Sequence, residues 1–290
     1  MINLKNALIN SFPFPHSIIK NSLEEKNLNN LINEFPTSED VKRYENVMGG
    51  RKRLSSDSPL FYNFINKNPS WKAFYQSVNS KEFVNEIFSL YKDELKKSGC
   101  IVDEFIFDAD FLFHKSQGKS DAIKASIQNK GWYSYLLRVL FKTGLNRALK
   151  NIFYYIPLRL TQRFKKSRIH VHFDISYAND GYGVETHHDS ESRVAVFLIF
   201  FSSREEVGGT GGDFCIYEEN PTLGKKNAMF PSKKHVKLNL TVPPTKNLMF
   251  SFLSTPNSYH SVPRMKNTKG PLKFIYVGIS ANKTNLWKKK

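Results

Sequence analysis

Val194-Ala195-Val196-Phe197-Leu198-Ile199-Phe200-Phe201 is an uninterrupted apolar run of strand-forming residues, which predicts a strand covered on both faces. Gly208-Gly209-Thr210-Gly211-Gly212 predicts a turn that leads into the segment 213–217, and further strand-like segments follow at 236–242, 247–252 and 274–279. Upstream, an alternating strand is expected, with apolar Ile169, Val171, Phe173 and Ile175 on one face and polar His170, His172, Asp174 and Ser176 on the other. Several short strands separated by turn signals indicate a β-sandwich or barrel.

The residues before this region predict helices. Ser22 and Glu25 have the spacing of a capping box, and a helix is expected from about Leu23 to Glu34, before Pro36. A second helix is expected from Ser80 through about Leu95. The Gly-, Arg- and Ser-rich segment 48–58 is expected to be a loop, and 101–114 has the composition of strands.

Composition restricts the class of protein. The 290 residues are 40% hydrophobic and 14% aromatic, which is ample for a packed core. The two cysteines, Cys100 and Cys215, lie far apart, so neither a disulfide framework nor a cysteine-based zinc site is expected. The start of the chain lacks the order of a signal peptide, and no run of apolar residues is long enough to span a membrane. A cytoplasmic location is the expectation.

The net charge of +17 indicates an anionic partner or substrate. Most of it lies between Lys115 and Arg168, where 13 basic residues accompany one acid, Asp121. One interpretation is a basic helical insertion that forms a lid and recruits an anionic substrate or touches a membrane surface peripherally. The other is a pair of amphipathic helices that pack on the sheet and leave their charges in solvent. No nucleic-acid-binding motif accompanies the charge, so nucleic acid is not the expected partner.

A metal site is predicted from three residues. His187 and Asp189 are two residues apart, so they share a face of an extended segment, whereas His188 points the other way. His260 lies far downstream, in Ser258-Tyr259-His260-Ser261-Val262-Pro263, after a short loop. Two imidazoles and one carboxylate form the facial triad of non-haem Fe(II) oxygenases, which leaves coordination positions open. The alternative is a surface strand with polar residues. His170 and His172, which share a face with Asp174, are interpreted as polar residues of a strand.

The segment from Ile175 to Ser280 resembles the 2-oxoglutarate- and Fe(II)-dependent dioxygenases, in their prolyl 4-hydroxylase-like branch. The resemblance rests on Tyr177, on Thr186 to Asp189, on Arg193 to Leu198, on Gly208 to Phe214 and on Tyr259 to Pro263, in that order. The aromatic-proline start, Phe12 to Ile19, is also similar, while the block from Lys115 to Arg168 has no counterpart. The resemblance implies a double-stranded β-helix core of jelly-roll or cupin type with buttressing helices, mainly β within the α+β class.

The resemblance also implies roles for individual residues. His187, Asp189 and His260 would bind Fe(II), and the iron centre itself would carry the reaction, with no separate acid or base assigned. Lys273, on the last core strand, would pair with the distal carboxylate of 2-oxoglutarate, with Arg264 as second choice. Tyr177 would hydrogen-bond the same carboxylate.

The expected activity is therefore hydroxylation of an unactivated C–H bond with 2-oxoglutarate and O2 as cosubstrates, releasing succinate and CO2; desaturation stays open. The substrate would be a small molecule or a glycan or lipid precursor, anionic in one interpretation, and a peptide is not excluded. The alternative is a non-catalytic β-helix module that binds an anionic partner through the basic insertion. Residues 1–290 are expected to form one domain: a helical buttress (1–100), the β core (101–284, with the insertion at about 115–168) and a basic tail (285–290). The oligomeric state is left open.

Overall fold

The computed structural model describes residues 2–5, 7–47, 50–100, 105–114, 167–220, 223, 228–282 and 286–287. The basic block therefore lies outside the described residues, except for its last two residues, 167 and 168. Arg168 is exposed and pairs with Asp108, with 3.1 Å between Nη1 and Oδ2.

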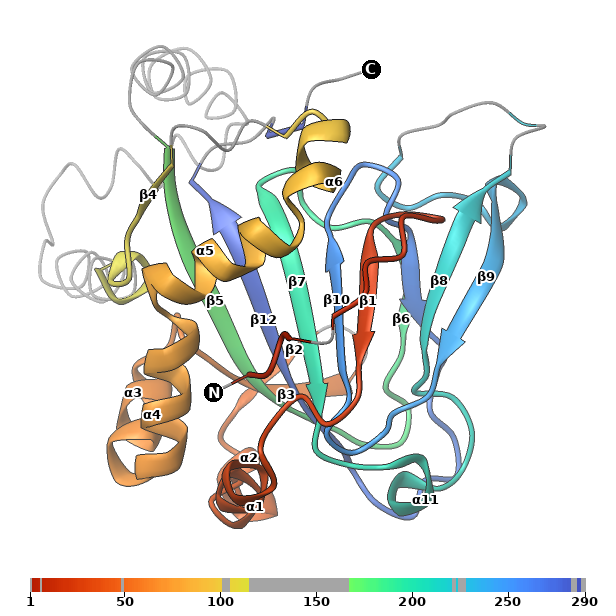
Figure 1. The fold of residues 1–290 in the computed structure, drawn as a ribbon. Helices are drawn as coiled ribbons and strands as arrows, with labels where there is room; N and C mark the ends of the chain where they lie inside the picture. Colours follow the sequence, from red (N-terminus) through yellow and green to blue (C-terminus); the bar gives the residue numbers. More distant parts are fainter. Residues whose placement is uncertain are drawn as a thin grey trace, which may run out of the picture.

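Two β-sheets face each other to form the core (Figure 1). Eight consecutive strands are divided between them: β5 (Ser167–Ala178), β6 (Val184–His187), β7 (Arg193–Phe200), β8 (Phe214–Glu219), β9 (Val236–Val242), β10 (Met249–Leu253), β11 (His260–Val262) and β12 (Leu272–Ala281). The large sheet contains β10-β7-β12-β5 and the small sheet has the order β6-β11-β8-β9. This alternation of strands between two antiparallel sheets is a double-stranded β-helix, as the resemblance implied.

Four more strands extend the large sheet: β1 (His16–Ile19) pairs with β10, β2 (Glu45–Val47) with β3 (Arg51–Ser55), and β3 and β4 (Phe105–Phe107) with β5. The prediction of a loop at 48–58 was wrong, because Arg51–Ser55 forms a strand of the large sheet between β5 and β2. The strand prediction for 101–114 holds only for β4, since residues 111–114 are helical and 101–104 lie outside the described part.

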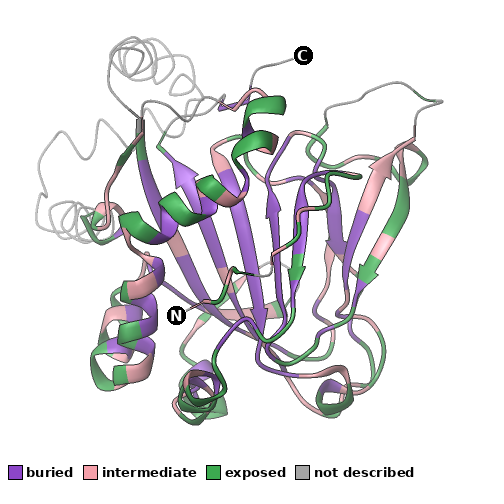
Figure 2. Cartoon of the chain, in the orientation of Figure 1, coloured by how far each residue is buried: buried purple, intermediate pink, exposed green. Residues whose placement is uncertain are grey.

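Helices cover the outer face of the large sheet (Figures 1 and 2). They are α1 (Glu25–Asn33), α2 (Ser38–Val41), α3 (Pro59–Lys67), α4 (Pro69–Val78), α5 (Lys81–Leu90) and α6 (Lys92–Lys97), and the short α11 (Arg204–Val207) and a 3-10 turn (Lys233–His235) lie in later connections. As predicted, Ser80 caps α5, its hydroxyl accepting from the Phe83 N–H. The expected cap on α1 does not form: Ser22 donates to Asn247 instead, and Glu24 is the N-cap residue.

The large sheet thus has two covered faces and two apolar cores. The outer face packs on the helices through residues such as Phe173, Ile275 and Val277. The inner face packs on the small sheet through residues such as Leu198, Phe250 and Phe274. Within the basic tail expected at 285–290, Leu286 and Trp287 are buried in the outer core. None of the helices in the described segments has the length and apolar content needed to span a bilayer.

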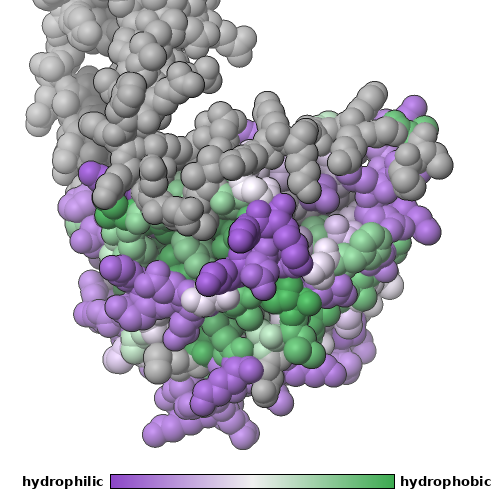
Figure 3. Space-filling view, turned by 45° about the horizontal axis from the view of Figure 1, so that its top comes forward, coloured by the Kyte–Doolittle hydropathy of each residue, from purple (hydrophilic) through white to green (hydrophobic). Residues whose placement is uncertain are grey.

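The surface is mixed in character. On the face shown in Figure 3, hydrophobic side chains form patches bordered by hydrophilic ones. Among the described residues, large exposed apolar side chains include Leu8 and Phe230, which are 84% and 57% exposed. Single exposed residues of this kind are normal on protein surfaces.

Candidate metal centre and its cavity

His187, Asp189 and His260 come together at one end of the small sheet. His187 ends β6 and His260 begins β11, and the two residues are paired directly across these strands. One ligand atom from each of the three side chains lies within 4.8 Å of the others. The structure therefore brings together all three residues that the sequence singled out as metal ligands, as a group able to hold one ion.

The hydrogen bonds of the two histidines prepare them for a metal. Nδ1 of His187 lies 2.8 Å from the carbonyl oxygen of Glu185, and Nδ1 of His260 lies 2.9 Å from that of Ser258. A carbonyl can only accept, so both Nδ1 atoms are donors, and in the neutral tautomer that carries this proton Nε2 offers its lone pair to a metal. Burial, with His187 close by, lowers the pKa of His260 to about 4, which keeps its ring neutral at physiological pH.

Asp189 completes the donor set. Its Oδ2 is buried and has no hydrogen-bond partner among the described residues. An unpaired buried carboxylate oxygen is costly unless a cation or a proton satisfies it. Two neutral imidazoles and one carboxylate suit Fe(II) and leave room for further ligands on the metal. His188, by contrast, is buried beside Tyr259, and its Nδ1 contacts the carbonyl of Asp189.

The triad opens into a cavity of about 300 Å³ between the two sheets. Its walls are mainly apolar, from residues such as Leu198, Phe214 and Phe274. The charged side chains in its lining are Arg51, Arg53, Arg193, Asp174 and the ligand Asp189. Three arginines against two aspartates leave the lining positive, which suits an anionic ligand.

The residues predicted to hold 2-oxoglutarate do not line this cavity. Lys273 and Tyr177 are paired across β12 and β5, but both lie on the outer face of the sheet. The Nζ of Lys273 lies 5.2 Å from the ring centroid of Phe35, in a separate pocket of about 220 Å³, and Tyr177 packs on the outer core. Arg264 is exposed, outside the cavity lining. Because side chains alternate along a strand, the inner positions of β12 belong to Leu272, Phe274 and Tyr276.

The basic side chains of the cavity come from β3 and from the start of β7. The Cζ of Arg51 lies 5.6 Å and 5.9 Å from the ring centroids of Phe274 and Tyr276. The Cζ of Arg193 lies 5.2 Å from the ring centroid of Tyr276. Sequence reasoning missed these arginines because it treated 48–58 as a loop and used the segment around Arg193 only as part of a resemblance.

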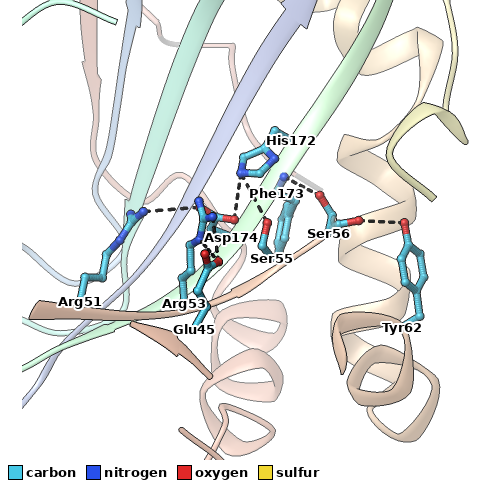
Figure 4. A network of polar contacts seen from close by, with 9 residues as sticks. All are labelled: Glu45, Arg51, Arg53, Ser55, Ser56, Tyr62, His172, Phe173 and Asp174. Atoms are coloured by element: carbon cyan, nitrogen blue, oxygen red, sulfur yellow. Dashed lines mark hydrogen bonds and ion pairs between the residues drawn. The ribbon is translucent and has the colours of Figure 1, made fainter. Parts of the chain in front are cut away.

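A buried carboxylate holds part of this wall in place (Figure 4). Asp174 is 1% exposed and lies 3.0 Å from Nε2 of His172 and 3.5 Å from a guanidinium nitrogen of each of Arg51 and Arg53. Burial would raise the pKa of Asp174, but His172 and the arginines outweigh it and hold the pKa far below its usual value. The available signal was the polar face of β5. A row of polar residues in a sheet that is covered on both faces indicates a cavity, and His172 and Asp174 of this row do line it.

Comparison with known proteins finds only distant structural similarity. No family model and no curated protein matches the sequence. Among solved structures, a prolyl 4-hydroxylase of Phytophthora capsici has a TM-score of 0.45 at 9% identity, covering 92% of this chain and 59% of its own. A prolyl-4-hydroxylase of Pseudomonas putida has a TM-score of 0.44 at 8% identity, covering 91% of each chain. A prolyl hydroxylase of Trichoplax adhaerens, solved with a peptide fragment, has a TM-score of 0.41 at 10% identity, covering 91% of this chain and 83% of its own. At such identities the function has to be inferred from the site itself.

Proposed function

We propose that this protein is an Fe(II)- and 2-oxoglutarate-dependent dioxygenase that hydroxylates an unactivated C–H bond. The observation that carries the proposal is the donor set: His187, Asp189 and His260 meet within 4.8 Å at the wall of a cationic cavity. Iron held there would supply the oxidation, in which O2 and 2-oxoglutarate are converted with the substrate to a hydroxylated product, succinate and CO2.

The protein's own contribution starts with the geometry of the ligands. The carbonyls of Glu185 and Ser258 hold the two imidazoles in one tautomer, which aims both Nε2 atoms away from the strand backbone. Asp189 supplies one negative charge, and three protein ligands leave open positions for a chelating cosubstrate. Phe214 and Phe252 line the cavity next to His260, and Val196 also lines it, so the wall beside this ligand is apolar.

Arg51 is the proposed partner of the distal carboxylate of 2-oxoglutarate, in place of Lys273. Its guanidinium lies over Phe274 and Tyr276, the inner positions of β12. A planar guanidinium suits bidentate binding of a carboxylate. Among the described residues its one acidic partner is Asp174, which is 3.5 Å away and is shared with Arg53 and His172, so Arg51 keeps donors for a ligand.

Metal binding and turnover can be tested separately. The wild-type protein should bind one Mn(II), used as a redox-stable substitute for Fe(II), and should release succinate slowly from Fe(II) and 2-oxoglutarate even without substrate. His260→Ala should lose both properties. His114→Ala is the matched control, because His114 is exposed and outside the cavity lining. Equal succinate release by the wild type and His260→Ala would refute the proposal.

A further inference from the structure

Arg193 is the cavity residue with the least satisfied side chain. Its Nε and Nη1 are buried and have no hydrogen-bond partner among the described residues. The absence of a side chain at Gly278 provides the space for it, because a Cβ built on Gly278 would lie only 1.7 Å from Nη1 of Arg193. The guanidinium thus occupies the space above Gly278 on the inner face of β12, beside the ring of Tyr276.

The register of the strands places this guanidinium at the level of the metal site. Gly278 pairs with Val196 of β7, and Val196 pairs with Phe252 of β10. The ring centroid of Phe252 lies 4.9 Å from that of His260. Both guanidiniums lie near the ring of Tyr276, with Cζ at 5.2 Å for Arg193 and 5.9 Å for Arg51. From there Arg193 extends over Gly278, whereas Arg51 extends over Phe274, which precedes Gly278 by four residues, or roughly 13 Å, on β12. Of the two, Arg193 therefore lies at the level of the metal site.

Buried guanidinium donors without partners are costly, and an anion that completes their hydrogen bonds removes this cost. Asp189 adds to the electrostatic surroundings of Arg193, but no hydrogen bond or ion pair links the two among the described residues. Under the proposed function, Asp189 would also be committed to the metal. Iron and 2-oxoglutarate carry opposite charges of equal size, so binding both would leave the lining of the cavity as positive as before.

We propose that Arg193 receives an anionic group of the substrate, so that the substrate is a small carboxylic or phosphoric acid whose reacting carbon lies within a few atoms of its charge. This inference rests on the proposed function and deepens it. The fork of Nε and Nη donors matches two oxygens of one carboxylate or phosphate. Tyr276 and Gly278 act as positioning residues, since the first packs against the guanidinium and the second leaves space for it.

The test uses acetate as the probe and acetamide as its uncharged counterpart. Protein loaded with Mn(II) and saturated with 2-oxoglutarate is titrated with each, and the paramagnetic relaxation of the probe's methyl protons reports binding close to the metal. Acetate should bind in the millimolar range and acetamide should not. Arg193→Gln should weaken acetate binding by roughly tenfold or more, which is the loss of one charge-assisted contact. Arg193→Lys should retain part of it.

Lys273→Gln is the matched control and should bind acetate like the wild type, because Lys273 faces the helices. The proposal is overturned if acetate binds equally to the wild type and Arg193→Gln, if acetamide binds as well as acetate, or if the wild type shows no binding in the millimolar range. Failure of the proposed function looks different: the wild type would bind Mn(II) but not 2-oxoglutarate. The acetate titration can then be run without the cosubstrate and still reports on Arg193.

Discussion

Lys273 and Tyr177 are direct neighbours across β12 and β5, and both turn their side chains away from the metal cavity. On the same two strands, the inner positions next to them are occupied by Phe274 and Ala178, which belong to the core between the sheets. A shift of one residue along a strand therefore separates the cavity from the helical layer.

The first prediction concerns 2-oxoglutarate. Arg51→Gln should raise the Kd of the Mn(II)-loaded protein for 2-oxoglutarate by roughly 10- to 100-fold, because a hydrogen bond to a charged group contributes about 1.5–3 kcal/mol. Lys273→Gln should change this Kd less than about twofold. Calorimetric titration of both variants measures the difference. If Lys273→Gln had the larger effect, the assignment of Arg51 would be wrong.

The second prediction concerns acid stability. The pKa of Asp174 is held well below that of an unfolded aspartate by His172 and the arginines, against the opposing effect of burial. Its stabilising contribution is therefore complete above about pH 5 and is lost as the pH falls below about 4 toward the native pKa. Asp174→Asn should cost about 3 kcal/mol at pH 7 and flatten the acid decline.

Urea unfolding between neutral and acidic pH checks this prediction. Asp93→Asn, at an exposed position of α6, should behave like the wild type. If Asp174→Asn kept the wild-type acid slope, other carboxylates would be responsible for the acid sensitivity.

The third prediction concerns the space beside Gly278. Gly278→Ala should displace the guanidinium of Arg193, because the new methyl group would overlap Nη1, and should cost about 1–3 kcal/mol of stability. Combining it with Arg193→Ala should recover part of that loss, since the conflicting side chain is then gone. Denaturant unfolding of the two single variants and the double variant gives the coupling energy. Strict additivity would show that the two positions do not interact.

The fourth prediction concerns the end of the described chain. Trp287 is 5% exposed, and its Nε1 donates to the carbonyl of Arg193 over 3.4 Å, which ties the chain to the start of β7. Trp287→Ala should lower the free energy of unfolding by about 3–5 kcal/mol, and Trp287→Phe by less. A loss below about 1 kcal/mol for the alanine variant in urea unfolding would mean that this contact is not maintained in solution.

Much of the fold followed from local patterns. Apolar runs and alternation predicted the strands β5, β7, β9, β10 and β12 near their observed positions, and Ser80 predicted the start of α5. The candidate metal ligands could also be predicted from the sequence, because the spacing of His187 and Asp189 and the position of His260 at a strand start are local features. The strand β3 was not predicted, since its arginines and lysine gain their strand conformation from pairing with β5 and β2.

The sequence by itself determined which residues of each strand share a face, because side chains alternate with a period of two. Only the tertiary structure decided which of the two faces of each strand lines the cavity. Both faces of the large sheet are covered, one by helices and one by the small sheet, so burial and apolar character do not distinguish them. For that reason Lys273 was expected at the cosubstrate, while Arg51 and Arg193, which come from distant segments, line the cavity.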